Sequence, residues 1–181
     1  CANCHDHPLD QWTQDDYHGL AAVFAKIRSG QIVKVADNGQ VIHPKTGKNA
    51  VPRSPGTKFV DDSEEPLNTF ADWLVADQNP YFARAIVNRL WKSLMGRGLV
   101  EPADDLRATN PATHPRLLKK LADDFVEHEF DLRHTLRLIA ASHAYARSSH
   151  SISGNESDVR YYSHRIGQRM EPEVWADAIS D

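Results

Sequence analysis

The sequence predicts a mainly α fold: a helical domain with a small β-hairpin insertion, preceded by an N-terminal segment that carries a Cys-x-x-Cys-His motif. Three observations predict this class. Apolar residues recur at helical spacing through most of the second half, whereas an Asp-Asn-Gly sequence lies between two β-branched runs near residue 38. The only two cysteines, Cys1 and Cys4, lie too close together to join distant parts of the chain, so packing must stabilise the fold.

The first helix is expected over residues 14–28. Thr13 followed by Asp16 is typical of a helix N-terminal cap, and Ser29-Gly30 is typical of a helix end. The apolar residues that share one face of this helix are Leu20, Val23, Phe24 and Ile27.

The strongest strand signal follows in residues 32–42, where β-branched residues flank Asn38-Gly39, a dipeptide typical of a tight hairpin turn. Residues 43–65 are rich in Pro, Gly, Lys and Ser and predict a long surface connector. We therefore expect two domains, residues 1–62 and residues 63–181.

Five further helices are expected in the second domain, because its apolar residues repeat every three or four positions and its caps are recognisable. They are residues 66–77, a helix with Pro80 in its first turn that ends at Gly96, residues 114–130 capped by Thr113, residues 132–145 capped by Asp131, and a short last helix that begins near Glu171 or Pro172.

Composition limits the function classes. The 181 residues are 40% hydrophobic and 25% charged with a net charge of −4, which is typical of a globular protein and argues against nucleic acid as a partner. No apolar stretch approaches 18 residues, so no transmembrane segment is expected. Because Cys1 opens a motif without a leader before it, we expect the chain to be the later part of a longer exported precursor; the alternative is that Cys1 is the lipid-bearing first residue of a processed lipoprotein.

The opening residues CANCH have the spacing of a covalent haem attachment site. In such a site two thiols each add to one vinyl group of the porphyrin, and the imidazole after the second thiol binds the iron. Chance placement of the cysteines and histidines produces this spacing on the order of one time in a thousand. The motif therefore predicts haem c held by Cys1 and Cys4, with His5 as the proximal iron ligand.

Two other uses of the motif stay open. A zinc site would combine the two cysteines with His5 and either His7 or a distant His18 or His43, although adjacent ligands at positions 4 and 5 strain a tetrahedron. A thioredoxin-like redox pair would need a strand before the motif and a helix directly after it.

The residues around a haem are less determined. Asp6 and His7 are expected to hydrogen-bond either the local backbone or a haem propionate, since His7 is too close to His5 to reach the opposite face of one porphyrin. A sixth iron ligand, if there is one, would come from His18, His43, His164, Met95 or Met170.

Two stretches resemble known families. Residues 1–25, CANCHDHPLDQWTQDDYHGLAAVFA, resemble the end of the planctomycete cytochrome c-type domain, and residues 79–149, from NPYFARAIVNRLW to AYARSS, resemble the planctomycete-specific domain of unknown function that usually follows it. The resemblance implies large exported proteins, often with further haem-type or carbohydrate-binding modules. It implies that the second domain is incomplete here, and it carries over the haem roles of Cys1, Cys4 and His5 and nothing further.

The second domain has one polar constellation of its own. Arg84 and Asn88 lie one turn apart, beside Arg89, and an acidic Asp104-Asp105 pair follows. These residues predict either an anionic pocket, for haem propionates or a sugar acid, or a charged network that ties the helix to the 104–107 loop; the network is favoured. A third class, an enzyme acting on polysaccharide, would need paired carboxylates across a cleft, for which Asp104 and Asp105 are the pair to test. The acids at positions 123, 124 and 127 are expected to form a solvated helix face.

The sequence thus predicts an exported region that binds haem c and passes single electrons to an unknown redox partner. The alternative is a non-catalytic binding or scaffold module with a structural zinc or an unligated Cys-Cys-His cluster. Nothing in the sequence selects a catalytic activity, although an iron without a sixth ligand would permit peroxidase-like chemistry.

Overall fold

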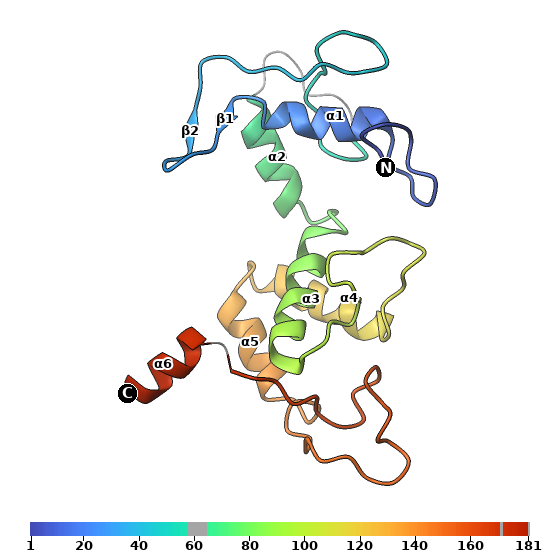
Figure 1. The fold of residues 1–181 in the computed structure, drawn as a ribbon, viewed down its shortest axis with the longest axis vertical. Coiled ribbons are helices and arrows are strands. Elements are labelled where there is room, and N and C mark those ends of the chain that lie inside the picture. The colour runs from blue at the N-terminus through green and yellow to red at the C-terminus, as the bar shows by residue number, and fades with distance from the viewer. Residues whose placement is uncertain (58–64, 171, 181) are drawn as a thin grey trace. The chain divides into compact units, whose positions relative to one another are not determined.

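The chain divides into two units, residues 1–79 and 80–181, in a computed structural model that describes residues 1–57, 65–170 and 172–180. The expected mainly α fold with a small hairpin is confirmed: helices dominate, and the named strands of the described part form one antiparallel pair (Figure 1). The domain boundary expected between residues 62 and 63 lies outside the described residues. Within the described ranges, no helix combines the length and apolar character needed to cross a bilayer.

Helix α1 spans Gln14–Val23 and begins with the predicted cap: the Thr13 hydroxyl accepts from the Asp16 N–H, and the Asp16 carboxylate accepts from the Thr13 N–H. The predicted end at residue 28 is wrong. Phe24 and Ala25 donate to carbonyls three residues back, which tightens and ends the helix. Gly39 lies so close to Ala25 that a Cβ at Gly39 would be 2.0 Å from the Ala25 carbonyl oxygen, so this backbone contact replaces the last expected turn.

The hairpin forms earlier in the chain than the sequence suggests. β1, Ile27–Arg28, pairs antiparallel with β2, Lys34–Val35, so the connection runs through residues 29–33 rather than through Asn38-Gly39. Asn38 instead accepts a hydrogen bond from the Arg28 guanidinium through its main-chain oxygen, at 2.8 Å. Asn38 and Gly39, the predicted turn residues, therefore pack against the segment that follows α1 instead of forming the hairpin turn.

Helix α2, Pro66–Val75, begins at its proline and ends two residues before the expected position. It packs against α1 through aromatic rings: Phe24 lies edge-on to Phe70 at 5.2 Å, and Phe70 stacks on Trp73 at 5.6 Å. The Phe24–Phe70 contact joins the end of α1 to α2.

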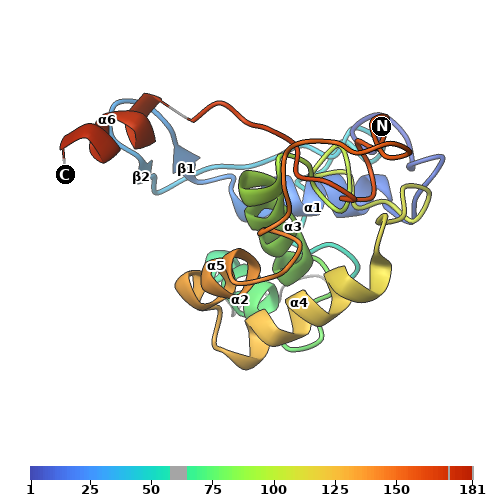
Figure 2. The same ribbon diagram turned by 90° about the horizontal axis from the view of Figure 1, so that it is seen from below.

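Three helices form the core of the second unit: α3, Phe82–Met95; α4, Pro115–Glu127; and α5, Leu132–Ala140. Figure 2 shows α4 leading through a short turn into α5. The last helix, α6, spans Pro172–Ser180, as expected. The buried apolar residues are Ala83, Val87, Trp91, Met95, Leu99, Val100, Leu118, Leu121, Ala122, Phe125, Ile139 and Tyr162.

The helix ends of this unit test the predicted caps. Gly96 ends α3 in the left-handed region with φ of 83°, and Asp131 caps α5 by accepting from the Arg133 and His134 N–H groups, both as predicted. The predicted Thr113 cap is wrong, because Thr113 donates both its N–H and its hydroxyl to the Leu99 carbonyl. His114 takes the cap position of α4 without a side-chain hydrogen bond.

Candidate functional site

The Cys-x-x-Cys-His segment forms one helical turn. The Cys1 carbonyl accepts from the Cys4 N–H at 3.0 Å and from the His5 N–H at 3.3 Å, which are the i to i+3 and i to i+4 bonds of a helix. Residues three and four apart share one face of such a turn. The spacing therefore assigns the two thiols, both free and exposed, and the exposed His5 imidazole to one side of the segment.

One hydrogen bond fixes which nitrogen of His5 carries a proton. His5 Nδ1 lies 2.7 Å from the Asp6 carbonyl oxygen, and because a carbonyl only accepts, Nδ1 must donate. In the neutral ring the lone pair is then on Nε2, the atom through which a protein histidine binds a metal when its other nitrogen is held by a backbone carbonyl.

Asp6 and His7 both contact local backbone, one of the two alternatives that the sequence offers for them. Asp6 Oδ1 accepts from the Gln14 N–H at 2.9 Å, at the positive N-terminal end of α1. His7 Nδ1 accepts from the Leu9 N–H at 3.1 Å, so its proton is on Nε2, the opposite of His5. Asp6 thus ties the motif to the start of α1, whereas the His7 bond stays within the turn after the motif.

Two of the five candidates for a sixth iron ligand belong to the same unit as the motif. His18, on α1, is buried, and its Nε2 lies 3.1 Å from the carbonyl oxygen of Asn3, a residue within the motif. The buried His43 ring lies edge-on to His18 at 4.9 Å, with its Nε2 3.1 Å from Asp15 Oδ1. The sequence did not reveal this pair, since 25 residues separate the two histidines.

The other three candidates lie in the second unit. Met95 is 1% exposed and packs in the core of that unit, whereas Met170 is 56% exposed. His164 has a buried Nδ1. Met95 is therefore a packing residue in this structure, as expected from its place at the end of an amphipathic helix.

The buried carboxylate of Asp16 links α1 to a later segment of the first unit. Asp16 Oδ1 accepts from the Gly56 N–H at 3.0 Å and lies 3.3 Å from an Arg53 guanidinium nitrogen. Burial by itself raises the pKa of Asp16, but the hydrogen bonds from Thr13 and Gly56 and the charge of Arg53 outweigh it, so the pKa lies below its ordinary value. Asp16 is therefore an ionised link between α1 and the 53–56 segment.

The predicted constellation of the second unit divides into a buried and an exposed part. Asn88 is fully buried: its Nδ2 donates to the Val100 and Ala103 carbonyls, and its Oδ1 accepts from the Val100 N–H. Arg84, one turn earlier, is exposed. The two side chains therefore face different surroundings, and Asn88 is occupied by the loop backbone.

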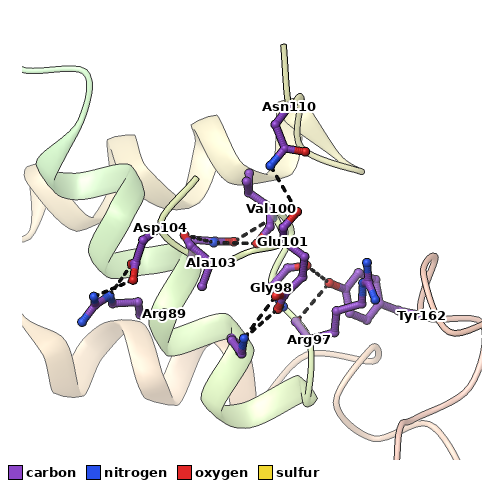
Figure 3. A network of polar contacts seen from close by, with 11 residues as sticks. Arg89, Arg97, Gly98, Val100, Glu101, Ala103, Asp104, Asn110 and Tyr162 are labelled. Carbon is purple, nitrogen blue, oxygen red and sulfur yellow. Dashed lines mark hydrogen bonds and ion pairs between the residues drawn. The ribbon is translucent and has the colours of Figure 1, made fainter. Parts of the chain in front are cut away.

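The network that ties α3 to the 104–107 loop is confirmed. Arg89 forms a bidentate ion pair with Asp104 at 2.7 and 2.9 Å (Figure 3). Asp105 pairs with Arg107. Figure 3 also shows the Tyr162 hydroxyl directed at the main chain of Arg97 and Gly98. Both aspartates of the supposed carboxylate pair are thus engaged by arginines.

One cluster was missed by sequence reasoning. Asp124, His128 and His134 each bring a possible metal-ligating atom within 4.8 Å of the others. Of the acids expected on a solvated face, Asp123 and Glu127 are exposed as predicted, but Asp124 is half-buried and contacts both histidines. The sequence signal that could have revealed the cluster is the i to i+4 spacing of Asp124 and His128, shortly before Asp131, the cap of the next helix.

The comparisons with known proteins give the family. Residues 68–180, more than half of the chain, match the model of PSD1, a protein family of unknown function (DUF1553). The chain belongs to the PSD1 family. Residues 1–29 match the model of PSCyt2, also described as of unknown function (DUF1549). No curated protein and no solved structure matches the chain.

The two matches separate the features described above. The PSCyt2 match contains the Cys-x-x-Cys-His turn, α1 and His18, whereas the PSD1 match contains Asn88, the Arg89–Asp104 ion pair and the cluster at the end of α4. The predicted resemblance to planctomycete-type domains of unknown function is thereby confirmed, without a match to a cytochrome c domain.

A groove lined by basic side chains also lies within the second unit. Its volume is about 810 Å³, and no acidic side chain belongs to the lining that the structure describes. Arg165 lies over the Tyr145 ring at 4.1 Å, and Arg147 donates to the Ser163 carbonyl. The basic lining residues are Lys92, Arg147, Arg165 and Arg169.

Proposed function

We propose that this chain is a region of an exported protein that binds haem c covalently through Cys1 and Cys4, with His5 as the proximal iron ligand, and that it transfers single electrons to a redox partner. The observation that carries the proposal is the shared face of the helical turn, on which two free thiols accompany an imidazole whose Nε2 bears the lone pair. Haem c, once bound, supplies the iron that gains and loses one electron.

Each residue of the motif has a feature that suits haem c. Cys1 and Cys4 are exposed and unpaired, so both sulfurs are available for thioether bonds, in which each S–H adds across a vinyl double bond without a further product. The Asp6 carbonyl orients the His5 ring, as backbone carbonyls do for metal-ligating histidines. His7 Nε2–H is a donor of the kind that a propionate accepts.

His18, one of the buried histidine pair, hydrogen-bonds the backbone of the Cys-x-x-Cys-His segment. His18 bonds to the Asn3 carbonyl, between the two cysteines, and Gln14 Nε2 donates to the same oxygen at 3.4 Å. Since both residues are on α1, the helix restrains the backbone that positions the thiols. We expect this restraint to hold His5 in one orientation, which limits the reorganisation that accompanies electron transfer.

The test is to produce residues 1–181 behind a secretory leader in a bacterial host with an active cytochrome c maturation system. We expect a red protein whose pigment survives acid-acetone extraction and whose intact mass includes one haem. Cys1→Ser together with Cys4→Ser should abolish the attachment. His7→Gln, the matched control for His5→Gln, should keep the haem and its spectrum, whereas His5→Gln should change the axial-ligand spectrum.

A colourless product with both thiols unmodified would refute the proposal. If such a product carried one zinc ion that the double serine variant lost, the scaffold alternative with a structural metal would replace it; without zinc, an unligated cluster would remain. Cell fractionation of the native protein tests the exported location, which a cytoplasmic fraction would contradict.

A further inference from the structure

A group of side chains that could ligate a metal lies in the second unit, where α4 turns into α5. His134 Nε2 lies 2.9 Å from Asp124 Oδ2. His128 Nδ1 lies 3.6 Å from Asp124 Oδ1 and donates to the Asp124 main-chain carbonyl at 2.9 Å, which leaves the lone pair of the neutral ring on Nε2. The two imidazole rings stack with their centroids 3.7 Å apart and their planes 12° from parallel. One possible ligating atom from each of the three side chains thus lies within 4.8 Å of the others.

The fold builds this convergence from both sides of the turn. Asp124 and His128 are one helical turn apart at the end of α4. The chain then reverses through Glu129 and Phe130, both in the left-handed region, and the Phe130 N–H bonds to the Phe125 carbonyl. Asp131 caps α5 by accepting from the His134 N–H, which places His134 in the first turn of that helix.

Aromatic packing holds the reversal in place. The Phe130 ring lies edge-on to the buried Phe125 at 5.3 Å and tilted against Phe82 at 5.9 Å. These contacts join α3, α4 and the turn between α4 and α5. The approach of His128 to His134 is therefore set by packed backbone rather than by the side chains alone.

We propose that Asp124, His128 and His134 form a binding site for a divalent transition metal ion of the zinc class. Two imidazoles with one carboxylate suit zinc and its neighbours, whereas magnesium and calcium prefer oxygen ligands. Zinc bonds of ~2.0–2.1 Å at tetrahedral angles separate ligand atoms by ~3.3 Å. The separation of His134 Nε2 from Asp124 Oδ2, 2.9 Å, is close to that value, and one ligating atom of each of the three side chains lies within 4.8 Å of the others, so rotation of the His128 side chain completes the site.

The two imidazoles must leave their stacked arrangement to bind one ion. The ring planes are 12° from parallel, so their in-plane lone pairs run nearly side by side, and both nitrogens reach one metal only after the His128 side chain, which is 43% exposed, rotates. Binding then replaces the hydrogen bond between His134 Nε2 and Asp124 and releases its proton. Three protein ligands leave one position of the ion open to water or to a substrate.

The experiment uses the full chain with Cys1→Ser and Cys4→Ser, which removes the competing thiols and makes the result independent of the proposed haem site. After chelation, zinc is titrated by isothermal calorimetry and counted by elemental analysis. We expect one equivalent to bind, and Asp124→Asn, His128→Gln and His134→Gln each to weaken binding by at least about tenfold.

Matched controls come from α4 and from the segment that follows α5. Asp123→Asn removes a neighbouring exposed carboxylate that pairs with Lys119, and His143→Gln removes an exposed histidine outside the cluster. Both variants should bind zinc as the parent does. Because the His128 side chain is 43% exposed, His128→Gln should fold even if the other variants do not, and circular dichroism checks this. Absence of zinc binding by the parent, or equal binding by His128→Gln, would overturn the site.

Discussion

Replacement of Asn88 by alanine should destabilise the second unit more than any change to an exposed residue of α3. Asn88 makes three hydrogen bonds from a fully buried position, two to the Val100 and Ala103 carbonyls and one from the Val100 N–H, at 2.9–3.0 Å. The loop also approaches closely here, since a Cβ at Gly98 would be 3.1 Å from the Asn88 amide. No other side chain takes over these backbone groups when the amide is removed.

The expected loss follows from these contacts. Each intramolecular hydrogen bond contributes about 1 kcal/mol net, so three bonds give about 3 kcal/mol, and the orphaned Val100 N–H with the cavity raises the loss to about 3–5 kcal/mol. Near the midpoint, each kcal/mol lowers the melting temperature of a domain this size by about 4–8 °C. We therefore expect Asn88→Ala to melt at least about 12 °C lower.

Two comparisons separate hydrogen bonding from volume and from charge. Asn88→Asp keeps the volume and one acceptor but turns both donor contacts into repulsion between the carboxylate and two carbonyls, so it should be at least as unstable as Asn88→Ala. Arg89→Ala, the adjacent residue, removes only an exposed ion pair and should have little effect.

The assay is urea unfolding followed by the fluorescence of buried Trp91, in a parent whose other three tryptophans are changed to phenylalanine, so that the signal reports the second unit alone. A mild Asn88→Asp, or equal midpoints for Asn88→Ala and Arg89→Ala, would refute the assignment of the amide as the main link between α3 and the loop.

Two further predictions concern pH. The pKa of Asp16 is lowered on folding, so its contribution to the first unit is complete above the unfolded pKa of about 4 and is lost as pH falls through the lower folded value. Asp16→Asn should therefore be less stable at neutral pH, with a gap that closes in acid-unfolding curves; a constant gap would contradict this. Burial raises the pKa of Tyr162, so the second unit should lose stability as pH rises above about 10, and Tyr162→Phe should remove that loss while lowering stability at neutral pH by about 1 kcal/mol. Unfolding midpoints from pH 8 upward that fall equally in both proteins would count against Tyr162.

The features that the sequence predicted correctly depend on neighbours a few residues away. Thr13 with Asp16, Asp131, and Gly96 end or begin helices through bonds to backbone groups within four residues, so the residue types suffice. The Cys-x-x-Cys-His motif is equally local, because five consecutive residues contain every group that its turn brings to one face. Local signals therefore gave the fold class and the candidate site.

The errors have a common physical cause, which is competition from distant backbone. Thr113 has the right type for a cap, but its hydroxyl bonds to Leu99, 14 residues earlier. Asn38-Gly39 has the right type for a turn, but the approach of Gly39 to Ala25 uses the small residue for packing. The cluster of Asp124 with two histidines depends on left-handed residues at 129 and 130, and glutamate and phenylalanine carry no sequence signal for that conformation.

The two histidines of the sequence CHDH show what the structure adds to a motif. As residue types, His5 and His7 are equivalent metal ligands. In the structure, however, a carbonyl acceptor fixes the ring proton of His5 on Nδ1, and an N–H donor fixes that of His7 on Nε2. A haem iron would use the His5 lone pair without disturbing either bond. Zinc held by both histidines would require His7 either to release the Leu9 N–H or to lose its Nε2 proton. Haem binding would therefore need less rearrangement of the turn after the motif than a zinc site that uses His7, which is the physical reason to test haem first.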